Sequence, residues 1–157
     1  MPNILFVCHA NRFRSVLAAE HFRRLLAGDN AEADWTVSSA GVWATEGIPP
    51  LRQAIQFAAA KQMDVSHVRS SEINAQLVAE ADLILVMEES QREAITIEFP
   101  GAKNKTCLLS TIALGENFNI PDPMLSLDED PDVIAEEIIN ILNSGYQNII
   151  SRFSQQA

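Results

Sequence analysis

The first 26 residues constrain the fold and chemistry of this chain more than any other stretch. A short apolar run, Ile4-Leu5-Phe6-Val7, predicts a buried strand, and residues 16–26 carry apolar side chains at helical spacing. The polar crossing between them begins at Cys8 and reaches Arg14. Such a crossing presents unpaired backbone N–H groups, and the dipole of the following helix favours an anion there. The sequence therefore predicts an anion site between this strand and this helix.

The spacing of Cys8 and Arg14 suits a nucleophile in that site. The five residues between them can turn their N–H groups inward and form a nest for a tetrahedral oxyanion. These N–H groups and the Arg14 cation would stabilise the thiolate of Cys8, which is the reactive form of cysteine. Arg14 can bind two phosphate oxygens, and Ser15 can donate its hydroxyl to the sulfur. The alternative reading of the spacing is a small buried cysteine and a surface cation.

Composition indicates one globular domain that spans residues 1–157, with 47% hydrophobic and 20% charged residues. The formal charge of −10 disfavours a nucleic-acid partner, because phosphates reward basic patches. No basic segment precedes an early apolar stretch, and no apolar run approaches the ~18 residues of a membrane span. Cys8 and Cys107 have neither disulfide nor zinc spacing. We therefore expect a cytoplasmic protein without a membrane partner, a metal or a cofactor.

The order of apolar segments predicts an α/β fold. Near-continuous apolar strands that alternate with helices indicate a four-stranded parallel sheet with helices on both faces, a Rossmann-like three-layer arrangement. Ligands of such sheets bind at the carboxyl ends of the strands, where the crossing at Cys8 falls. A dinucleotide would compete for that position, but residues 8–15 contain no glycine to admit a pyrophosphate. The strands are expected at 3–7, 35–40, 83–86 and 106–109, and the helices at 14–28, 51–62, 71–79, 89–97 and 131–153.

Asp122 is the candidate for a general acid. Hydrolysis of a phosphate monoester at neutral pH needs a proton for the leaving oxygen, which a positioned carboxylic acid can supply. Pro121 and Pro123 flank Asp122 and stiffen the backbone around it. Taken alone, Pro-Asp-Pro also fits an ordinary turn.

Five ordered motifs give the chain a resemblance to a known family over nearly its whole length. They are Val-Cys-His-Ala-Asn-Arg-Phe-Arg-Ser at 7–15, Trp-Thr-Val-Ser-Ser-Ala-Gly at 35–41, Ser-His-Val-Arg at 66–69, Asp-Leu-Ile-Leu-Val-Met at 82–87 and Ile-Pro-Asp-Pro at 120–123. Together they resemble the low-molecular-weight protein tyrosine phosphatases. The resemblance implies the phosphotyrosine phosphatase I-like fold and hydrolysis of phosphotyrosine proteins or small aryl phosphates through a cysteinyl-phosphate. It also implies a monomer or weak dimer.

The resemblance also assigns roles to individual residues. Cys8, Arg14 and Asp122 take the positions of the nucleophile, the phosphate-binding arginine and the general acid. Four polar residues take positions that brace the loop by hydrogen bonds: Asn11, Ser15, Ser39 and His67. The expected substrate contacts are His9, Ala10, Arg12, Phe13, Trp43 and Met124.

Several positions depart from the family pattern. Phe13 stands where the family commonly has a second loop cysteine, which removes a disulfide partner for Cys8. Ala10 replaces a glycine and would be strained if its φ were positive. Met124 and Leu125 stand where tyrosines usually form an aromatic wall, and Trp43 could supply that wall or instead pack against the sheet edge.

Two other functions fit the same loop. An arsenate reductase of this fold would need further cysteines for a thiol relay, and Cys107 is the one other cysteine. A catalytically weak anion-binding regulatory module would keep the loop without turnover.

Overall fold

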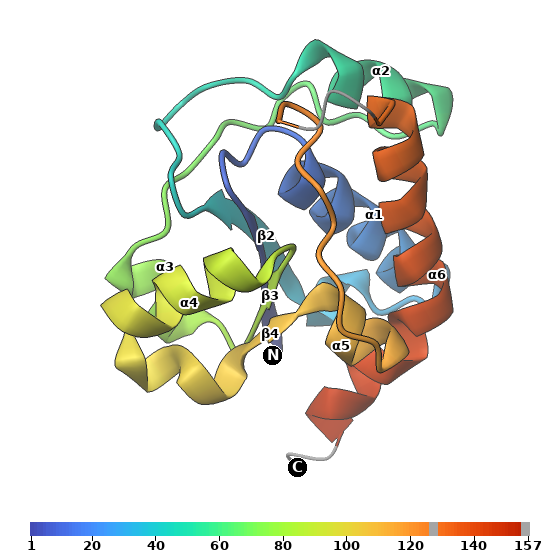
Figure 1. The fold of residues 1–157 in the computed structure, drawn as a ribbon. Helices are drawn as coiled ribbons and strands as arrows, with labels where there is room; N and C mark the ends of the chain where they lie inside the picture. Colours follow the sequence, from blue (N-terminus) through green and yellow to red (C-terminus); the bar gives the residue numbers. More distant parts are fainter. Residues whose placement is uncertain (126–128, 155–157) are drawn as a thin grey trace.

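The computed structural model describes residues 1–125 and 129–154, and a central sheet lies between two groups of helices (Figure 1). The sheet contains β1 (Asn3–Cys8), β2 (Thr36–Gly41), β3 (Leu83–Val86) and β4 (Thr106–Leu108). All pairings are parallel, and the strand order is β2-β1-β3-β4. The predicted four-stranded parallel sheet is confirmed.

Alternation along β1 supplies a hydrophobic core to both faces of the sheet. Ile4 and Phe6 join a core with α1 (Arg14–Gly28), α2 (Arg52–Ala60), α5 (Leu109–Leu114) and α6 (Pro131–Ser154). Leu5 and Val7 join a second core with α3 (Ala75–Glu80) and α4 (Glu89–Glu98). Because successive side chains of a strand point to opposite faces, the continuous apolar run of β1 is buried on both sides.

The strand order makes β1 an inner strand, so its carboxyl end lies between the ends of β2 and β3. β1 pairs with β2 on one side and with β3 on the other, so the chain reverses its direction of progress across the sheet there. A crevice forms at such a switch point, beyond the carboxyl ends of the strands. Cys8 is the last residue of β1 and Glu88 lies two residues beyond β3, so both stand at this end of the strands.

One helix was not expected from the sequence. Leu109 begins α5 instead of ending the last strand, and α5 packs against α6. Gly145 of α6 allows this close approach, because a Cβ there would lie 2.3 Å from the Cβ of Ala113. The short helix expected at 71–79 begins later, at Ala75, because Asn74 caps it by accepting the N–H of Leu77 at 2.9 Å. Short 3₁₀ helices occupy 32–34 and 100–105.

Within residues 1–125 and 129–154, no helix has both the length and the apolar character that crossing a membrane requires.

A buried histidine joins α1 to α6. His21 is 7% exposed, and its Nε2 lies 2.7 Å from Oδ1 of Asn143, whereas its Nδ1 is buried without a hydrogen-bond partner among the described residues. Burial lowers the pKa of His21, an effect that the Asn143 bond opposes and that the cations of Arg24 and Lys61 reinforce. The neutral imidazole is therefore the form that the folded state favours.

We expect His21 to make the protein less stable as the pH falls. A folded-state pKa below the unfolded value of 6.5 gives full stability above pH 6.5, and that stability is lost as His21 takes up a proton on acidification. Urea unfolding at several pH values between about 7 and 5 measures this slope, with His21→Gln as the variant that cannot titrate. An equally steep slope in both proteins would contradict this role of His21.

Candidate active site

The sulfur of Cys8 lies where β1 ends and the 8–15 loop begins. Cys8 is 2% exposed, and its Sγ is 3.0 Å from Oγ of Ser15, in the first turn of α1. The loop therefore leaves the sheet at the sulfur and returns to it at the helix N-terminus. This is the geometry that the spacing of Cys8 and Arg14 predicts.

Asn11 holds the loop closed from inside. Its φ is 57°, a left-handed conformation that asparagine tolerates better than most residues. Its Nδ2 donates to Oγ of Ser15 at 2.8 Å and to Oγ of Ser39 at 3.0 Å, and its Oδ1 accepts the N–H of Ser71 at 2.9 Å. All hydrogen-bonding groups of this buried amide are engaged, which fixes the loop against β2 and the 70–73 segment.

The Asn11 bonds also orient the hydroxyl of Ser15. Because Ser15 Oγ accepts from Asn11, its own hydrogen is free to point at the Cys8 sulfur. A hydroxyl in this orientation can donate a hydrogen bond to Sγ.

Ala10 is not strained. The described residues with positive φ other than glycine are Asn11, Asn30 and Gln62, so the left-handed position of the loop falls on Asn11 and not on Ala10. The strain considered for an alanine at this place is therefore absent, because the backbone there never enters the left-handed region.

Arg14 is a buried cation between three segments. It is 2% exposed, and its Nη1 donates to Oε2 of Glu88 at 3.0 Å and to the carbonyl of Ile120 at 2.7 Å. Its Nη2 lies 3.5 Å from Oδ2 of Asp122. A buried guanidinium requires such partners, and they fix its plane at the mouth of the loop.

Asp122 faces Arg14 from a turn. Its Oδ2 is the oxygen near Arg14, and its Oδ1 accepts the N–H of Met124 at 2.9 Å. The second bond is a local turn contact that limits rotation of the carboxyl. The two readings of Pro-Asp-Pro therefore coincide, because the turn itself aims the carboxyl into the site.

These groups line one small cavity. Its lining residues are Cys8, Ala10, Arg12, Phe13, Arg14, Leu51, Asp122 and Met124. Arg12 is held in place because its Nε donates to the carbonyl of Pro49 at 2.9 Å. Four of the expected substrate contacts line this cavity: Ala10, Arg12, Phe13 and Met124.

Two expected substrate contacts lie outside the cavity lining. His9 is exposed, and its carbonyl accepts the N–H of Trp43 at 2.9 Å. Trp43 is 78% exposed, so its ring does not pack against the sheet edge. The backbone bond keeps Trp43 beside the loop, with its side chain in solvent.

His67 is not brought to the loop. Its side chain is exposed, and it makes no hydrogen bond to Asn11, Ser15 or Ser39 in the described part of the chain. The expected place of His67 in the bracing network is taken by the backbone N–H of Ser71. The backbone of the 70–73 segment lies against the loop, so no side chain from Ser66 to Arg69 needs to reach it.

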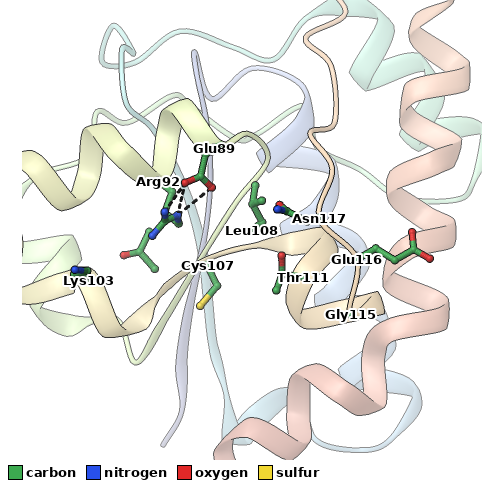
Figure 2. Close-up of a pocket in the computed structure, with 10 residues that line it drawn as sticks. Glu89, Arg92, Lys103, Cys107, Leu108, Thr111, Gly115, Glu116 and Asn117 are labelled. Atoms are coloured by element: carbon green, nitrogen blue, oxygen red, sulfur yellow. Dashed lines mark hydrogen bonds and ion pairs between the residues drawn. The ribbon is translucent and has the colours of Figure 1, made fainter.

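Cys107 lies in a different pocket, beside β4 (Figure 2). Cys107 pairs in register with Leu85 and Leu85 with Phe6, so Cys8 is two strands across and two residues along. The spacing of strands and residues puts the two Cα atoms roughly 12 Å apart, too far for a disulfide. Burial raises the pKa of the Cys107 thiol, and the nearby cations of Arg152 and Arg92 oppose this effect only in part.

No group of three or more histidine, cysteine, aspartate or glutamate side chains is placed to hold a metal ion among residues 1–125 and 129–154.

Glu88 is the site residue that the sequence analysis missed. The matched motif at 82–87 ends one residue before it. One signal was present, because Glu88 follows the carboxyl end of a buried strand, where the ligands of a parallel sheet bind. Leu51 was also missed, since an apolar residue in a proline-containing loop gives no signal of its own.

The comparisons with known proteins agree with this geometry. The model of the family "Low molecular weight phosphotyrosine protein phosphatase" matches residues 3–157. A probable low molecular weight protein-tyrosine-phosphatase, EpsP, from Ralstonia nicotianae is 35% identical over 123 residues, which cover 78% of this chain and 79% of that protein. A protein-arginine-phosphatase from Geobacillus stearothermophilus is 34% identical over 124 residues, 78% of this chain and 80% of that protein.

Solved structures of phosphatases share the fold of this chain. The YwlE arginine phosphatase from Geobacillus stearothermophilus aligns with a TM-score of 0.85 and 26% identity, covering 100% of this chain and 98% of that chain. Wzb from Vibrio vulnificus, in complex with benzylphosphonate, aligns with a TM-score of 0.74 and 32% identity, over 88% of this chain and 92% of that chain.

We expect Gly41→Ala to destabilise the fold at the loop. A Cβ at Gly41 would meet the carbonyl oxygen of His9 at 2.5 Å and the nitrogen of Asn11 at 2.9 Å, and both are backbone atoms that cannot rotate away. Urea unfolding should show a loss of about 2 kcal/mol. Gly28→Ala is the matched control, because nothing lies within 4 Å of its Cβ and it should change little. Equal effects of the two substitutions would contradict the close approach at Gly41.

Proposed function

The chain belongs to the low molecular weight phosphotyrosine protein phosphatase family, and on that premise we propose that it hydrolyses phosphotyrosine through a cysteinyl-phosphate on Cys8. One observation carries this proposal. Cys8 lines a cavity whose lining also includes Arg14 and Asp122. A nucleophile, an anion-binding cation and a proton donor therefore converge on one cavity.

In the first step the Cys8 thiolate attacks phosphorus in line with the leaving oxygen. The S–P bond forms while the P–O bond to the phenol breaks, and Asp122 gives its proton to that oxygen. Arg14 and the loop N–H groups hold the three equatorial oxygens, whose charge they stabilise in the transition state. Ser15 donates to the sulfur throughout.

In the second step water hydrolyses the cysteinyl-phosphate. Asp122, now a carboxylate, takes a proton from the water as its oxygen attacks phosphorus. The S–P bond breaks, inorganic phosphate leaves, and the thiolate is restored to the hydrogen bond from Ser15. Asp122 thus regains the proton that it used in the first step.

Substrate binding would change the partner of Asp122. Without substrate its carboxyl lies 3.5 Å from Arg14 Nη2. A bound phosphate dianion would engage the Arg14 cation in its place. Asp122 would then be free to face the leaving oxygen, to which it gives its proton in the first step.

The lining of the cavity favours phosphotyrosine over phosphoarginine. One relative named as a tyrosine phosphatase and another named as an arginine phosphatase match this chain at 35% and 34% identity, so sequence similarity alone does not decide the substrate. The leaving group of phosphoarginine is a guanidinium, which the cation of Arg12 in the cavity lining would repel. A phenyl ring is neutral and would contact the apolar side chains of Leu51, Phe13 and Met124 instead.

Exposed apolar side chains near the opening would contact a protein substrate. Trp43 is 78% exposed, Met124 55% and Leu125 79%, which sets them apart from the mostly polar surface. Met124 lines the cavity, and Trp43 is fixed beside the loop through His9. In this proposal Trp43 and Met124 replace the aromatic wall that the family's tyrosines would form.

The arsenate reductase alternative lacks a thiol relay. A relay needs a second thiol that can reach Cys8, and Cys107 lies two strands away in another pocket (Figure 2). An anion-binding module without turnover differs from an enzyme only in the measured rate. The location that we propose is the cytoplasm, where both free cysteines stay reduced, and we propose a monomer or weak dimer.

We expect Cys8→Ser to abolish hydrolysis of a phosphotyrosine peptide and Asp122→Ala to lower kcat by about 10²–10³-fold. Asp122→Ala should still bind vanadate, because Arg14 and the loop N–H groups remain. Steady-state kinetics and vanadate inhibition measure both effects, and Cys107→Ser is the matched control with unchanged activity.

The wild-type protein should prefer the phosphotyrosine peptide over the same peptide with phosphoarginine by about tenfold or more.

Activity that survives Cys8→Ser would refute the proposed nucleophile. Equal loss of turnover and of vanadate binding in Asp122→Ala would mean that Asp122 is a binding residue and not the general acid. A preference for phosphoarginine would agree with phosphatase activity but contradict phosphotyrosine as the substrate.

A further inference from the structure

Gln91 is a buried glutamine of α4 that lies outside the lining of the cavity. It is 2% exposed, and its side-chain amide makes three hydrogen bonds, each 3.0 Å long. Oε1 accepts the backbone N–H groups of Met87 and Glu88, and Nε2 donates to Oε2 of Glu88. The amide therefore holds both the backbone and the side chain of the residue that pairs with Arg14.

One carboxylate oxygen joins Gln91 to Arg14. Oε2 of Glu88 accepts from Gln91 Nε2 at 3.0 Å and from Arg14 Nη1 at 3.0 Å. Glu88 is partly exposed, with 28% of its side-chain surface accessible. A glutamate with one face open to water has other rotamers available, and the two donors together select the one that meets Arg14.

The same bonds reach the segment that carries Asp122. The carbonyl of Met87 accepts the N–H of Ile120 at 2.9 Å, and the carbonyl of Ile120 accepts from Arg14 Nη1 at 2.7 Å. A closed circuit of hydrogen bonds thus runs through Gln91, Glu88, Arg14, Ile120 and Met87. Asp122 follows Ile120 by two residues, so the position of its carboxyl relative to the Cys8 sulfur depends on this circuit.

We propose that Gln91 is a positioning residue for phosphoryl transfer: through Glu88 it fixes the Arg14 guanidinium, and through Arg14 it fixes the carbonyl of Ile120 and the segment that carries Asp122. This inference rests on the proposed function, which assigns the phosphate to Arg14 and the proton to Asp122. The bland role for Gln91 is that of an N-terminal cap for α4, since it also forms a capping box with Glu88. A cap contributes to stability, whereas a positioning residue also acts on phosphate binding and turnover.

A double-mutant cycle separates the two roles. Gln91→Met keeps the size of the side chain but removes all three hydrogen bonds, and Glu88→Ala removes the carboxylate through which Gln91 would act. Gln91→Met should lower kcat for p-nitrophenyl phosphate about tenfold in the native background and less than about twofold in the Glu88→Ala background. Gln76→Met, at an exposed glutamine of α3, is the matched control and should leave kcat unchanged. Equal losses in the two backgrounds would overturn the proposal.

Binding of inorganic phosphate gives a readout that needs no turnover. Calorimetry should show a Kd for phosphate that rises about tenfold in Gln91→Met and stays unchanged in Gln76→Met. If the wild-type protein binds phosphate but hydrolyses no ester, the proposed function fails while this arm still tests Gln91. If phosphate affinity is the same in wild type and Gln91→Met, Gln91 is only a cap.

Gln91→Glu keeps the protein testable if Gln91→Met does not fold. Its Oε1 still accepts the two backbone N–H groups, but a second carboxylate now faces Glu88. At lower pH the two carboxylates can share a proton, and the resulting O–H replaces the lost amide donor. The deficit in kcat relative to wild type should therefore shrink as the pH falls from about 7 to 5. A deficit that does not change with pH would overturn the proposal.

Discussion

The site depends on the pairing of one buried cation, Arg14. A guanidinium with 2% exposure has given up most of its hydration, and partners from two other segments compensate for that loss. Those segments are Glu88, between β3 and α4, and residues 120–122, and both lie far from Arg14 in sequence. Because both contribute a group to the same cation, the pairing of Arg14 also brings the 8–15 loop and Asp122 together.

The sheet explains why these segments meet. β1 and β3 are neighbours and parallel, so the 8–15 loop and Glu88 emerge at the same edge. A formal charge of −10 does not prevent an anion from binding there, since salt screens distant carboxylates while Arg14, Arg12 and the loop N–H groups act within a few ångströms. Local geometry, and not the net charge, decides which ligand the site accepts.

The parts of the site that lie close together in sequence could be predicted, and the parts that depend on tertiary contacts could not. The loop from Cys8 to Ser15 follows from one strand, one helix and the spacing between them, and the sheet follows from apolar runs. The one signal for Glu88 is its position after a buried strand, and Gln91 gives no local signal, because their roles arise only when β3 lies beside β1. His67 was wrongly expected in the bracing network. The backbone N–H of Ser71 binds Asn11 instead, and the Ser-His-Val-Arg motif alone gives no sign of that contact. α5 was missed because its six residues are as apolar as the strand before them.

Transfer of the phosphoryl group to Cys8 is the central step of the proposed mechanism. Trapping the cysteinyl-phosphate tests this step most directly. In Asp122→Ala the first step with p-nitrophenyl phosphate needs little acid assistance, because p-nitrophenolate is a good leaving group, while hydrolysis of the intermediate loses its base. Protein denatured rapidly during turnover and then analysed by mass spectrometry should carry one phosphoryl group, on Cys8. Absence of any adduct during turnover, or a phosphoryl group on another residue, would contradict the account.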